Sequence, residues 1–336
     1  MSCILIVDFG SQVMQLIARR VREIGVRSIV CNPSDVMAKV AELKPEGVIL
    51  SGGPDSVYAK EARTIDKQIF EAGVPILGIC YGQQVTCDLL GGKVERAEKR
   101  EFGKAEIKIK TKNNLITEGG VVWMSHGDFV SAIPSEFEVI AYTENAPFAG
   151  IKHKQKEIYG VQFHPEVTHS EIGFEILKNF VLNVCRAKQD WNMKRYKEEM
   201  IASIKKQAGG KKAICALSGG VDSAVAAKLV QEAIGENLIC IFVDTGFFFF
   251  FEAEEIKKAF PHVKVVDAKD QFYKELNGVS DPETKRKTIG RLFIEVFERE
   301  SHLVEGAEFL VQGTIYPDVI ESAGTGGAKN IKSHHN

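Results

Sequence analysis

The residues best suited to catalysis in the first half of the chain lie where short apolar runs end. Cys80 stands in Gly78-Ile79-Cys80-Tyr81-Gly82, directly after an apolar run. Glycines two positions before and after a nucleophile permit a tight strand-to-helix turn. Such a turn lifts the thiol out of a sheet and places it at a helix N-terminus, whose partial positive charge favours the thiolate. Taken alone, Cys80 has an alternative interpretation as a buried structural cysteine.

Two further segments favour the catalytic interpretation. A histidine and a carboxylate follow another apolar run in Phe163-His164-Pro165-Glu166. Because residues two apart in an extended segment point the same way, Glu166 can orient and polarise His164 while His164 faces the thiol. Ser51-Gly52-Gly53-Pro54 offers backbone N–H groups, and those of Gly53 and Tyr81 could form an oxyanion hole. Together the segments predict a Cys–His–Glu site for nucleophilic catalysis.

The second half carries a candidate anion-binding loop, Ser218-Gly219-Gly220-Val221-Asp222-Ser223. It follows an apolar run and precedes an alanine-rich helical pattern, so its amides and hydroxyls would point at an anion over a helix N-terminus. The lysine of a G-x-x-x-x-G-K-[ST] loop is missing. A Gly-rich turn alone is weak evidence for phosphate binding, but this combination of serines and Asp222 is more specific.

The elements that must position these residues form two series of alternating strands and helices. The first series predicts strands at 3–7, 27–31, 47–50 and 74–79, with helices such as 12–24 between them, and antiparallel strands within 91–143. The second predicts strands at 213–217, 238–243 and 263–266 and a helix at 222–234. We therefore expect an α/β protein of two domains, each a mainly parallel sheet flanked by helices. The charged stretch 186–197 suggests domains at 1–187 and 188–336.

Length and composition exclude several other classes. A chain of 336 residues that is 44% hydrophobic and 26% charged has material for two cores. Its net charge of −2 offers no basic field for nucleic acid or a membrane surface. We find no apolar run of about 18 residues. No two of the seven cysteines are three apart, which argues against a disulfide framework or a zinc knuckle. We expect a cytoplasmic chain with no nucleic-acid or membrane partner.

On these motifs, residues 1–187 resemble the class I glutamine amidotransferases. The resemblance implies that Cys80 attacks the side-chain amide of glutamine, with His164 as general base and acid and Glu166 as its orienter. It further implies that the backbone end of glutamine is held by Gln84, Ser125, Gly127 and Asp128. For His126 and Asp128 a purely structural turn role is an equal alternative. The products would be glutamate and ammonia.

The 218–223 loop resembles that of the N-type ATP pyrophosphatases, which split ATP into AMP and pyrophosphate. The resemblance implies that Ser218, Gly219, Gly220, Val221, Asp222 and Ser223 hold the pyrophosphate end of ATP. It implies further ATP contacts at Asp244, Gly313 and Lys332, and Mg²⁺ positioned by Asp222 and Asp318. Residues 281–291 would form a lid over the nucleotides through Lys285, Arg286 and Arg291. The alternative for that charged block is a solvated helix start.

The order of the two halves, with Gly313-Thr314-Ile315-Tyr316-Pro317-Asp318 and Ile331-Lys332-Ser333-His334-His335-Asn336, resembles the GMP synthases. These ligases adenylate the C2 oxygen of xanthosine monophosphate and displace AMP with ammonia from the glutaminase half. Two features depart from the family. Phenylalanines occupy 247–251, and because an exposed run would favour aggregation, we expect it to be buried or altered. The family also continues past Asn336 with a C-terminal domain that serves dimerisation and forms part of the xanthosine monophosphate site. We expect that domain to be absent here and a homodimer for the full-length protein.

Three alternatives remain open. The first is a glutaminase or amidase whose second half binds a nucleotide only as a regulator. The second is another amidotransferase built on an ATP pyrophosphatase, such as an NAD or asparagine synthetase. The third is a non-catalytic nucleotide-binding module, against which the set Cys80, His164 and Glu166 argues.

Overall fold

The computed structural model describes residues 2–247 and 252–314, except for the side chains of 97–100, 252 and 253. The chain divides into two compact units, the first ending at Asn192 and the second beginning at Met193. The boundary inferred from sequence, between 187 and 188, falls a few residues earlier. Part of the charged stretch that we expected to link the domains is helical, because α5 begins at Met193.

The first unit is built on a nine-stranded sheet of order β2-β1-β3-β4-β9-β8-β7-β5-β6. Five neighbouring strands are parallel: β2 (Arg27–Cys31), β1 (Cys3–Val7), β3 (Gly47–Leu50), β4 (Ile76–Ile79) and β9 (Ile158–Val161). The other four continue the sheet antiparallel: β8 (Gly150–His153), β7 (Phe137–Tyr142), β5 (Lys93–Ile109) and β6 (Gly120–Ala132). A mainly parallel sheet with an antiparallel extension is the predicted arrangement, so the fold class is confirmed.

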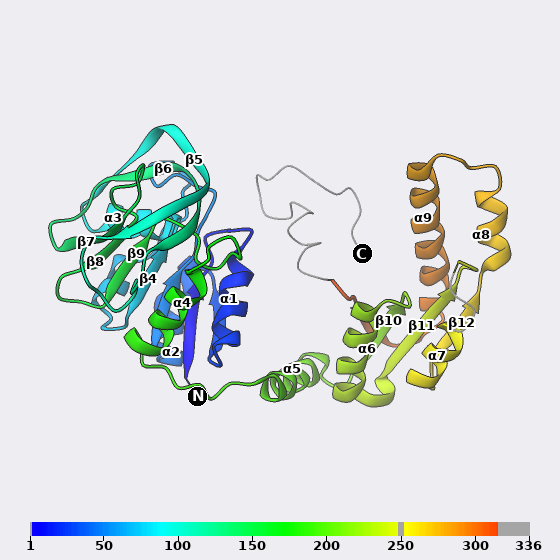
Figure 1. Cartoon of the computed structure of the whole chain (residues 1–336). Helices are drawn as coiled ribbons and strands as arrows, with labels where there is room; N and C mark the ends of the chain where they lie inside the picture. The colour runs from blue at the N-terminus through cyan, green and yellow to red at the C-terminus, as the bar shows by residue number, and fades with distance from the viewer. Residues whose placement is uncertain (1, 248–251, 315–336) are drawn as a thin grey trace. The chain divides into compact units, whose positions relative to one another are not determined.

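Helices cover both faces of this sheet, which explains why its central strands are continuously apolar (Figure 1). Along β1, Ile4 and Ile6 join the core beneath α1, while Leu5 and Val7 join the core beneath α2 and α3. The helices and helical turns of this unit are α1 (Met14–Glu23), α2 (Val36–Leu43), α3 (Tyr81–Leu89), α4 (Gly173–Lys178), η1 (Pro33–Asp35), η2 (Lys67–Glu71) and the π-helical η3 (Asn179–Val184).

The second unit has a parallel four-stranded sheet of order β12-β11-β10-β13. Its strands are β10 (Lys212–Leu217), β11 (Leu238–Asp244), β12 (Lys264–Asp267) and β13 (Ala307–Val311). Its helices are α5 (Met193–Ala208), α6 (Val221–Ile234), η4 (Gly235–Asn237), α7 (Glu252–Ala259), α8 (Lys269–Leu276) and α9 (Pro282–Ser301). The chain runs from β10 to β11 and β12 on one side and returns to β13 on the other. The order therefore reverses at β10, where open α/β sheets bind ligands beyond the carboxyl ends of their strands.

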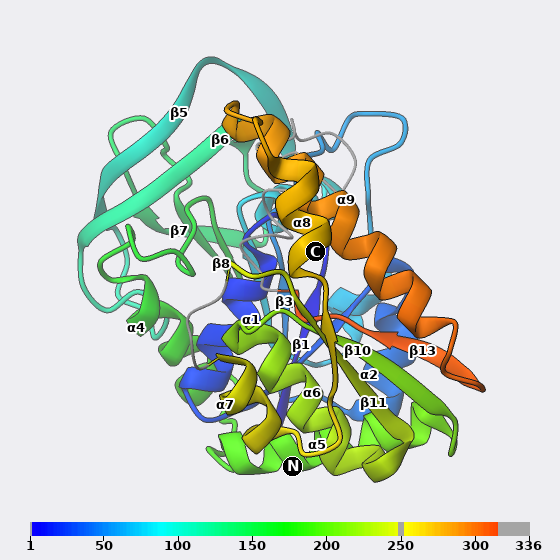
Figure 2. The same cartoon turned by 90° about the vertical axis from the view of Figure 1, so that its right-hand side faces the viewer.

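The sheet of the second unit is also covered on both faces. Cys240 and Phe242 of β11 share a core with α6, which lies alongside β10 and β11 in Figure 2. The intervening Ile241 and Val243 share a core with α8 and α9. The alternation of side chains along β11 thus joins two helical layers.

Gly82 allows α3 to lie directly on β3. A Cβ atom at this position would stand 2.3 Å from the carbonyl oxygen of Leu50, and backbone cannot yield by side-chain rotation. We expect Gly82→Ala to lower the free energy of unfolding of the first unit by about 2–3 kcal/mol. Both tryptophans of the chain, Trp123 and Trp191, belong to this unit, so urea unfolding followed by their fluorescence measures it selectively.

Gly290 in α9 is the matched control, because a Cβ atom there would meet no heavy atom of another element within 4 Å. Gly290→Ala should leave the tryptophan transition unchanged. Equal midpoints for Gly82→Ala and the unmodified protein would show that α3 can shift away from β3 at no cost.

Candidate active site

Cys80 occupies a strained turn between β4 and α3. Its backbone angles are φ 51° and ψ −105°, a conformation that side-chain-bearing residues rarely adopt. The glycines around it are required by packing, since a Cβ on Gly78 would stand 2.7 Å from the backbone nitrogen of Gln83. The Cys80 N–H donates to the Val161 carbonyl at 2.7 Å, which ties the turn to β9. The surrounding backbone therefore holds the thiol where the apolar run ends.

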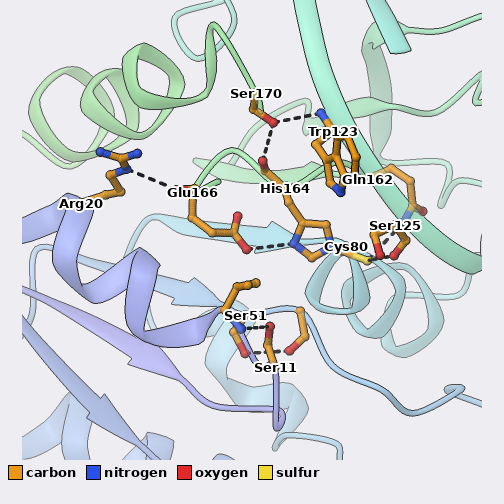
Figure 3. A network of polar contacts seen from close by, with 12 residues as sticks. Ser11, Arg20, Ser51, Cys80, Trp123, Ser125, Gln162, His164, Glu166 and Ser170 are labelled. Carbon is orange, nitrogen blue, oxygen red and sulfur yellow. Dashed lines mark hydrogen bonds and ion pairs between the residues drawn. The ribbon is translucent and has the colours of Figure 1, made fainter. Parts of the chain in front are cut away.

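The Cys80 thiol lies among polar groups from two other elements (Figure 3). Its sulfur is 3.7 Å from the Ser125 carbonyl oxygen and 3.7 Å from Nε2 of Gln162. Cys80 as a whole is 5% exposed, so these contacts are largely shielded from solvent. Tyr81 is the first residue of α3, and its N–H therefore has no acceptor within the helix.

His164 and Glu166 form a buried pair beside this thiol. Nδ1 of His164 lies 2.8 Å from Oε1 of Glu166, which has no exposed surface. Nδ1 faces the carboxylate, so the other ring nitrogen, Nε2, lies on the side of the ring that faces Cys80 (Figure 3). Arg20 donates from Nε to the Glu166 carbonyl at 3.2 Å and so fixes the backbone of the carboxylate residue.

The environment of His164 favours its protonated form. Burial acts to lower the pKa, but the charge of the Glu166 carboxylate and that of Cys80 in its ionised form together raise the pKa of His164 well above its ordinary value of 6.5. A raised pKa means that the folded protein binds this proton more tightly than the unfolded chain does. The resulting stability is fully present below about pH 6.5 and is lost as the pH rises through the folded-state pKa.

Glu166→Gln should lower the pKa of His164, because it removes a negative charge that opposes the effect of burial. The measurement is a pH titration of the imidazole signals by NMR, with His164 assigned among the eight histidines through His164→Ala. We expect the His164 midpoint to lie above 6.5 in the unmodified protein and to move down in the Gln variant. An unchanged midpoint would show that Glu166 does not control this ring.

Ser170 holds the backbone of His164 in place, and the sequence did not single it out. Its hydroxyl donates to the His164 carbonyl at 2.5 Å and accepts the Trp123 N–H at 2.9 Å. The His164 N–H donates in turn to the Trp123 carbonyl at 3.0 Å. These bonds, visible in part in Figure 3, tie the His164 backbone to β6.

A cavity of about 880 Å³ opens over Cys80 and brings most of the first-half candidates together. Its lining includes the predicted residues Gly53, Cys80, Tyr81, Gln84, Ser125, His126, Gly127, Asp128 and His164. Glu166 does not line it and lies behind His164. Position 53 has no room for a side chain, because a Cβ atom there would stand 2.8 Å from the Phe9 carbonyl oxygen. The cavity is large enough for an amino-acid substrate.

Asp128 is fixed by groups from two other segments. Ser56 donates to Oδ2 of its carboxylate, and the Tyr58 hydroxyl donates to Oδ1 at 2.9 Å. Gln84 donates from Nε2 to the Asp128 backbone carbonyl at 2.9 Å. Ser56 and Tyr58 also line the cavity, and neither was predicted as part of the site.

His126 has structural partners on both ring nitrogens. Nε2 lies 3.2 Å from Oε2 of Glu101, and Nδ1 lies 3.1 Å from the Asp128 carbonyl oxygen. Burial lowers the pKa of His126, although Glu101 opposes that shift. These contacts support the structural alternative for His126 alongside its place in the cavity wall.

In the second unit the 218–223 loop joins β10 to α6. The Ser223 hydroxyl donates to the Gly220 carbonyl at 3.1 Å, accepts the Ser218 N–H at 3.3 Å, and lies 3.1 Å from the Ser218 hydroxyl. Gly219 has φ +79°, which favours glycine. Val221 and Asp222 begin α6 and are exposed, so the loop presents a helix N-terminus to solvent.

Two further candidates lie at or just after the carboxyl ends of the strands that flank β10. Gly313 follows β13, and a Cβ there would stand 2.8 Å from the Ser223 backbone nitrogen, so Gly313 lies against the loop. Asp244 ends β11, where its carboxylate forms an ion pair with Lys269 at 3.0 Å and accepts the Gly246 N–H at 3.0 Å. The structure thus brings Gly313 and the loop together, while Asp244 contacts α8.

The charged block 281–291 forms the first turns of α9. Asp281 caps the helix by accepting the Thr284 N–H at 2.7 Å. Arg286 pairs with Glu283, and Arg291 with Glu295 at 2.7 Å, and both arginines are exposed, as is Lys285. A charged helix start is the alternative expected for this block, and the lid remains a prediction.

The phenylalanine run is described only at its first residue. Phe247 is 52% exposed and meets the rings of Phe272 and Tyr273 edge-on, with centroids 6.3 and 5.7 Å away. The expectation of burial is therefore wrong for Phe247, because one side of its ring faces α8 and the rest faces solvent. Residues 248–251 lie outside the described residues, as do the predicted Asp318 and Lys332.

Metal-ligand clusters and membrane-spanning helices are both missing from the described residues. Within residues 2–247 and 252–314, no group of three or more His, Cys, Asp or Glu side chains could hold a metal ion. In the same part of the chain no helix is both long and apolar enough to cross a membrane.

The strained cysteine turn, the His–Glu pair and the sheet define a class of enzyme. Residues 5–184 match the family model of glutamine amidotransferase class-I, and residues 193–248 match that of NAD synthase. The first unit is therefore a class I glutamine amidotransferase domain.

Curated relatives along nearly the whole chain narrow the family further. The protein named GMP synthase [glutamine-hydrolyzing] of Aquifex aeolicus is 53% identical over 341 residues, covering 99% of this chain and 67% of the relative. Proteins of the same name from Caldicellulosiruptor saccharolyticus and Phenylobacterium zucineum are each 53% identical, covering 99% of this chain and 66% of the relative. The chain belongs to the family of glutamine-hydrolysing GMP synthases. It spans about two thirds of the length of these relatives.

Proposed function

We propose that the chain carries the glutaminase site and the ATP-dependent site of a glutamine-dependent GMP synthase. The first unit hydrolyses glutamine to glutamate and ammonia. The second uses ATP to adenylate xanthosine monophosphate, which ammonia converts to GMP with release of AMP. The observation that supports this most is the Cys80 thiol, held in a strained turn beside His164–Glu166 at the wall of a cavity of about 880 Å³.

In the glutaminase reaction, Nε2 of His164 accepts the proton of the Cys80 thiol, and the sulfur attacks the side-chain amide carbon of glutamine. The hydrogen bond from Nδ1 to Glu166 fixes the tautomer that leaves Nε2 free to do this. The N–H groups of Gly53 and Tyr81 stabilise the oxyanion. His164 then returns the proton to the departing ammonia, and water hydrolyses the thioester to glutamate.

The backbone end of glutamine binds along the wall formed by Ser125, Gly127 and Asp128. The Asp128 carboxylate, held by Ser56 and Tyr58, supplies a negative charge for the α-ammonium group. Gln84 shapes this wall through its bond to the Asp128 carbonyl. Glutamine is thus oriented with its amide toward Cys80.

ATP binds with its phosphates at the 218–223 loop, where exposed residues begin α6. Mg²⁺ is commonly held by one or two carboxylates together with substrate phosphates, and the exposed Asp222 at this helix start fits that requirement. When bound, the ion would neutralise charge on the phosphate oxygens. Asp244, at the end of β11, lies at the sheet edge where the adenosine would bind.

Three finer assignments belong to the same proposal. Lys285, Arg286 and Arg291 would approach the nucleotide phosphates if α9 moves over them. The full-length protein would be a homodimer. The chain would reside in the cytoplasm, because its seven cysteines are free and buried in the structure and thiols stay reduced in that compartment.

The test supplies the protein with ATP, Mg²⁺ and xanthosine monophosphate, with either glutamine or ammonium chloride as nitrogen donor. Glutamate, AMP and pyrophosphate are measured separately. We expect glutamate only with glutamine, and slow AMP formation with either donor. Glutamate release with neither AMP nor pyrophosphate in any mixture would instead favour a glutaminase whose second unit binds a nucleotide as a regulator.

A further inference from the structure

The Cys80 sulfur has two polar neighbours with opposite chemical preferences. The Ser125 carbonyl can only accept, so it pairs with the neutral S–H group at 3.7 Å. Gln162 donates from Nε2 to the same sulfur at 3.7 Å. None of the steps carried by Cys80, His164 and the oxyanion hole uses Gln162.

Loss of the thiol proton changes these two contacts in opposite directions. A thiolate has no proton for the Ser125 carbonyl, whose lone pairs then face a negative charge. The N–H group of Gln162 instead gains a charged acceptor, and hydrogen bonds to ionised groups are about twice as strong as neutral ones. Gln162 is therefore the neighbour that favours the ionised sulfur.

The fold holds the Gln162 side chain at this place. Gln162 directly follows β9, the strand paired with β4, which leads into Cys80. Its own N–H donates to the Ala149 carbonyl at 3.0 Å, and the residue is 2% exposed. A buried donor attached to the neighbouring strand keeps its position while the sulfur changes charge.

We propose that Gln162 is a further catalytic residue of the glutaminase site, whose side-chain N–H stabilises the thiolate of Cys80. The inference rests on the proposed function, because it concerns the same nucleophile. The S–H bond breaks, the proton passes to His164, and no electrons are exchanged. The same N–H acts again when water opens the thioester, since the sulfur then leaves as a thiolate.

Several other charged or titratable groups surround this sulfur. His164 lies beside it with Glu166 behind the ring, while His126 with Glu101 and the Asp128 carboxylate belong to the cavity wall or support it. All of them remain in a Gln162 variant. When Gln162 alone is changed, any change in the pH at which Cys80 forms its thiolate therefore measures the effect of this N–H donor.

The test follows the pH dependence of Cys80 alkylation by iodoacetamide, because only the thiolate reacts. Tandem mass spectrometry assigns the alkylated cysteine, because fragmentation separates Cys80 from Cys87, which shares the Lys- and Arg-free stretch 68–92 with it. Gln162→Met removes the donor at similar volume. Gln83→Met is the matched control, since Gln83 is also a buried glutamine but donates to the Phe148 carbonyl at 2.8 Å.

We expect the alkylation midpoint to rise by about one pH unit in Gln162→Met, which is about tenfold slower reaction below the midpoint. Gln83→Met should keep the midpoint of the unmodified protein. Equal midpoints in Gln162→Met and the unmodified protein would overturn the proposal. Tryptophan fluorescence checks that each variant is folded.

Gln162→Glu decides the question if the Met variant does not fold. It keeps the shape of the side chain and replaces the donor with a negative acceptor, so the midpoint should rise further, and an unchanged midpoint would overturn the proposal. The alkylation assay needs no glutamine turnover. An unmodified protein without glutaminase activity would contradict the proposed function, whereas an active one with an unshifted Gln162 variant would contradict this inference alone.

Discussion

Cys80→Ala should reduce glutamate formation from glutamine by about 10⁴-fold or more, the scale on which removal of a catalytic nucleophile acts. The reason is that in the proposed mechanism the thiol forms the covalent bond to glutamine, and Cys80 is the one residue between β4 and α3. AMP formation with ammonium chloride as nitrogen donor should be unchanged, because Cys80 serves only the glutamine half-reaction. Both rates are measured on the same preparation.

Cys87 provides the matched control for this substitution. It is a fully buried cysteine of α3 that does not line the cavity. Cys87→Ala should keep glutamine hydrolysis, apart from any loss caused by lower stability. Equal loss of AMP formation with glutamine and with ammonium chloride in Cys80→Ala would contradict two separate sites.

Ser223→Ala and Asp222→Ala should each reduce ATP-dependent AMP formation by about 10²-fold or more, while glutamine hydrolysis continues. The Ser223 hydroxyl contacts Ser218 and Gly220, so its loss removes the bonds that shape the loop. Asp222 provides the exposed carboxylate at the start of α6. AMP release and ATP affinity by calorimetry are the measurements.

The control for the loop is Ser203→Ala, an exposed serine of α5. It should leave both activities intact. If ATP affinity and AMP release survive in both loop variants, residues 218–223 form only a structural turn.

Much of the fold could be predicted because both sheets are covered on two faces. The strands β1, β2 and β3 have the ranges expected from their apolar runs. The next strand begins at Ile76 rather than at the expected 74, because Pro75 has no N–H to donate to a neighbouring strand. The strand β13 was not predicted, since Ala307–Val311 alternates between exposed and half-buried residues and lacks a continuous apolar run.

The candidate site was only partly predictable, because a sequence pattern shows residues that are close along the chain but not contacts between distant segments. Cys80 was indicated by the glycines two positions before and after it, and His164 and Glu166 by their spacing of two. Ser56 and Tyr58 reach Asp128 from a segment far away in sequence that has no periodic pattern. Gln162 could have been found, because it stands only two residues before His164 at the end of the same apolar run.

Cleavage of glutamine through a covalent bond to Cys80 is the step on which the proposed function depends. The most direct measurement is to quench the protein with acid during turnover of glutamine and to determine the mass of the peptide that contains Cys80. We expect a glutamyl group attached to Cys80, absent without glutamine and absent in Cys80→Ala. Rapid glutamate formation with the glutamyl group on another residue, or at an undiminished rate in Cys80→Ala, would contradict this mechanism.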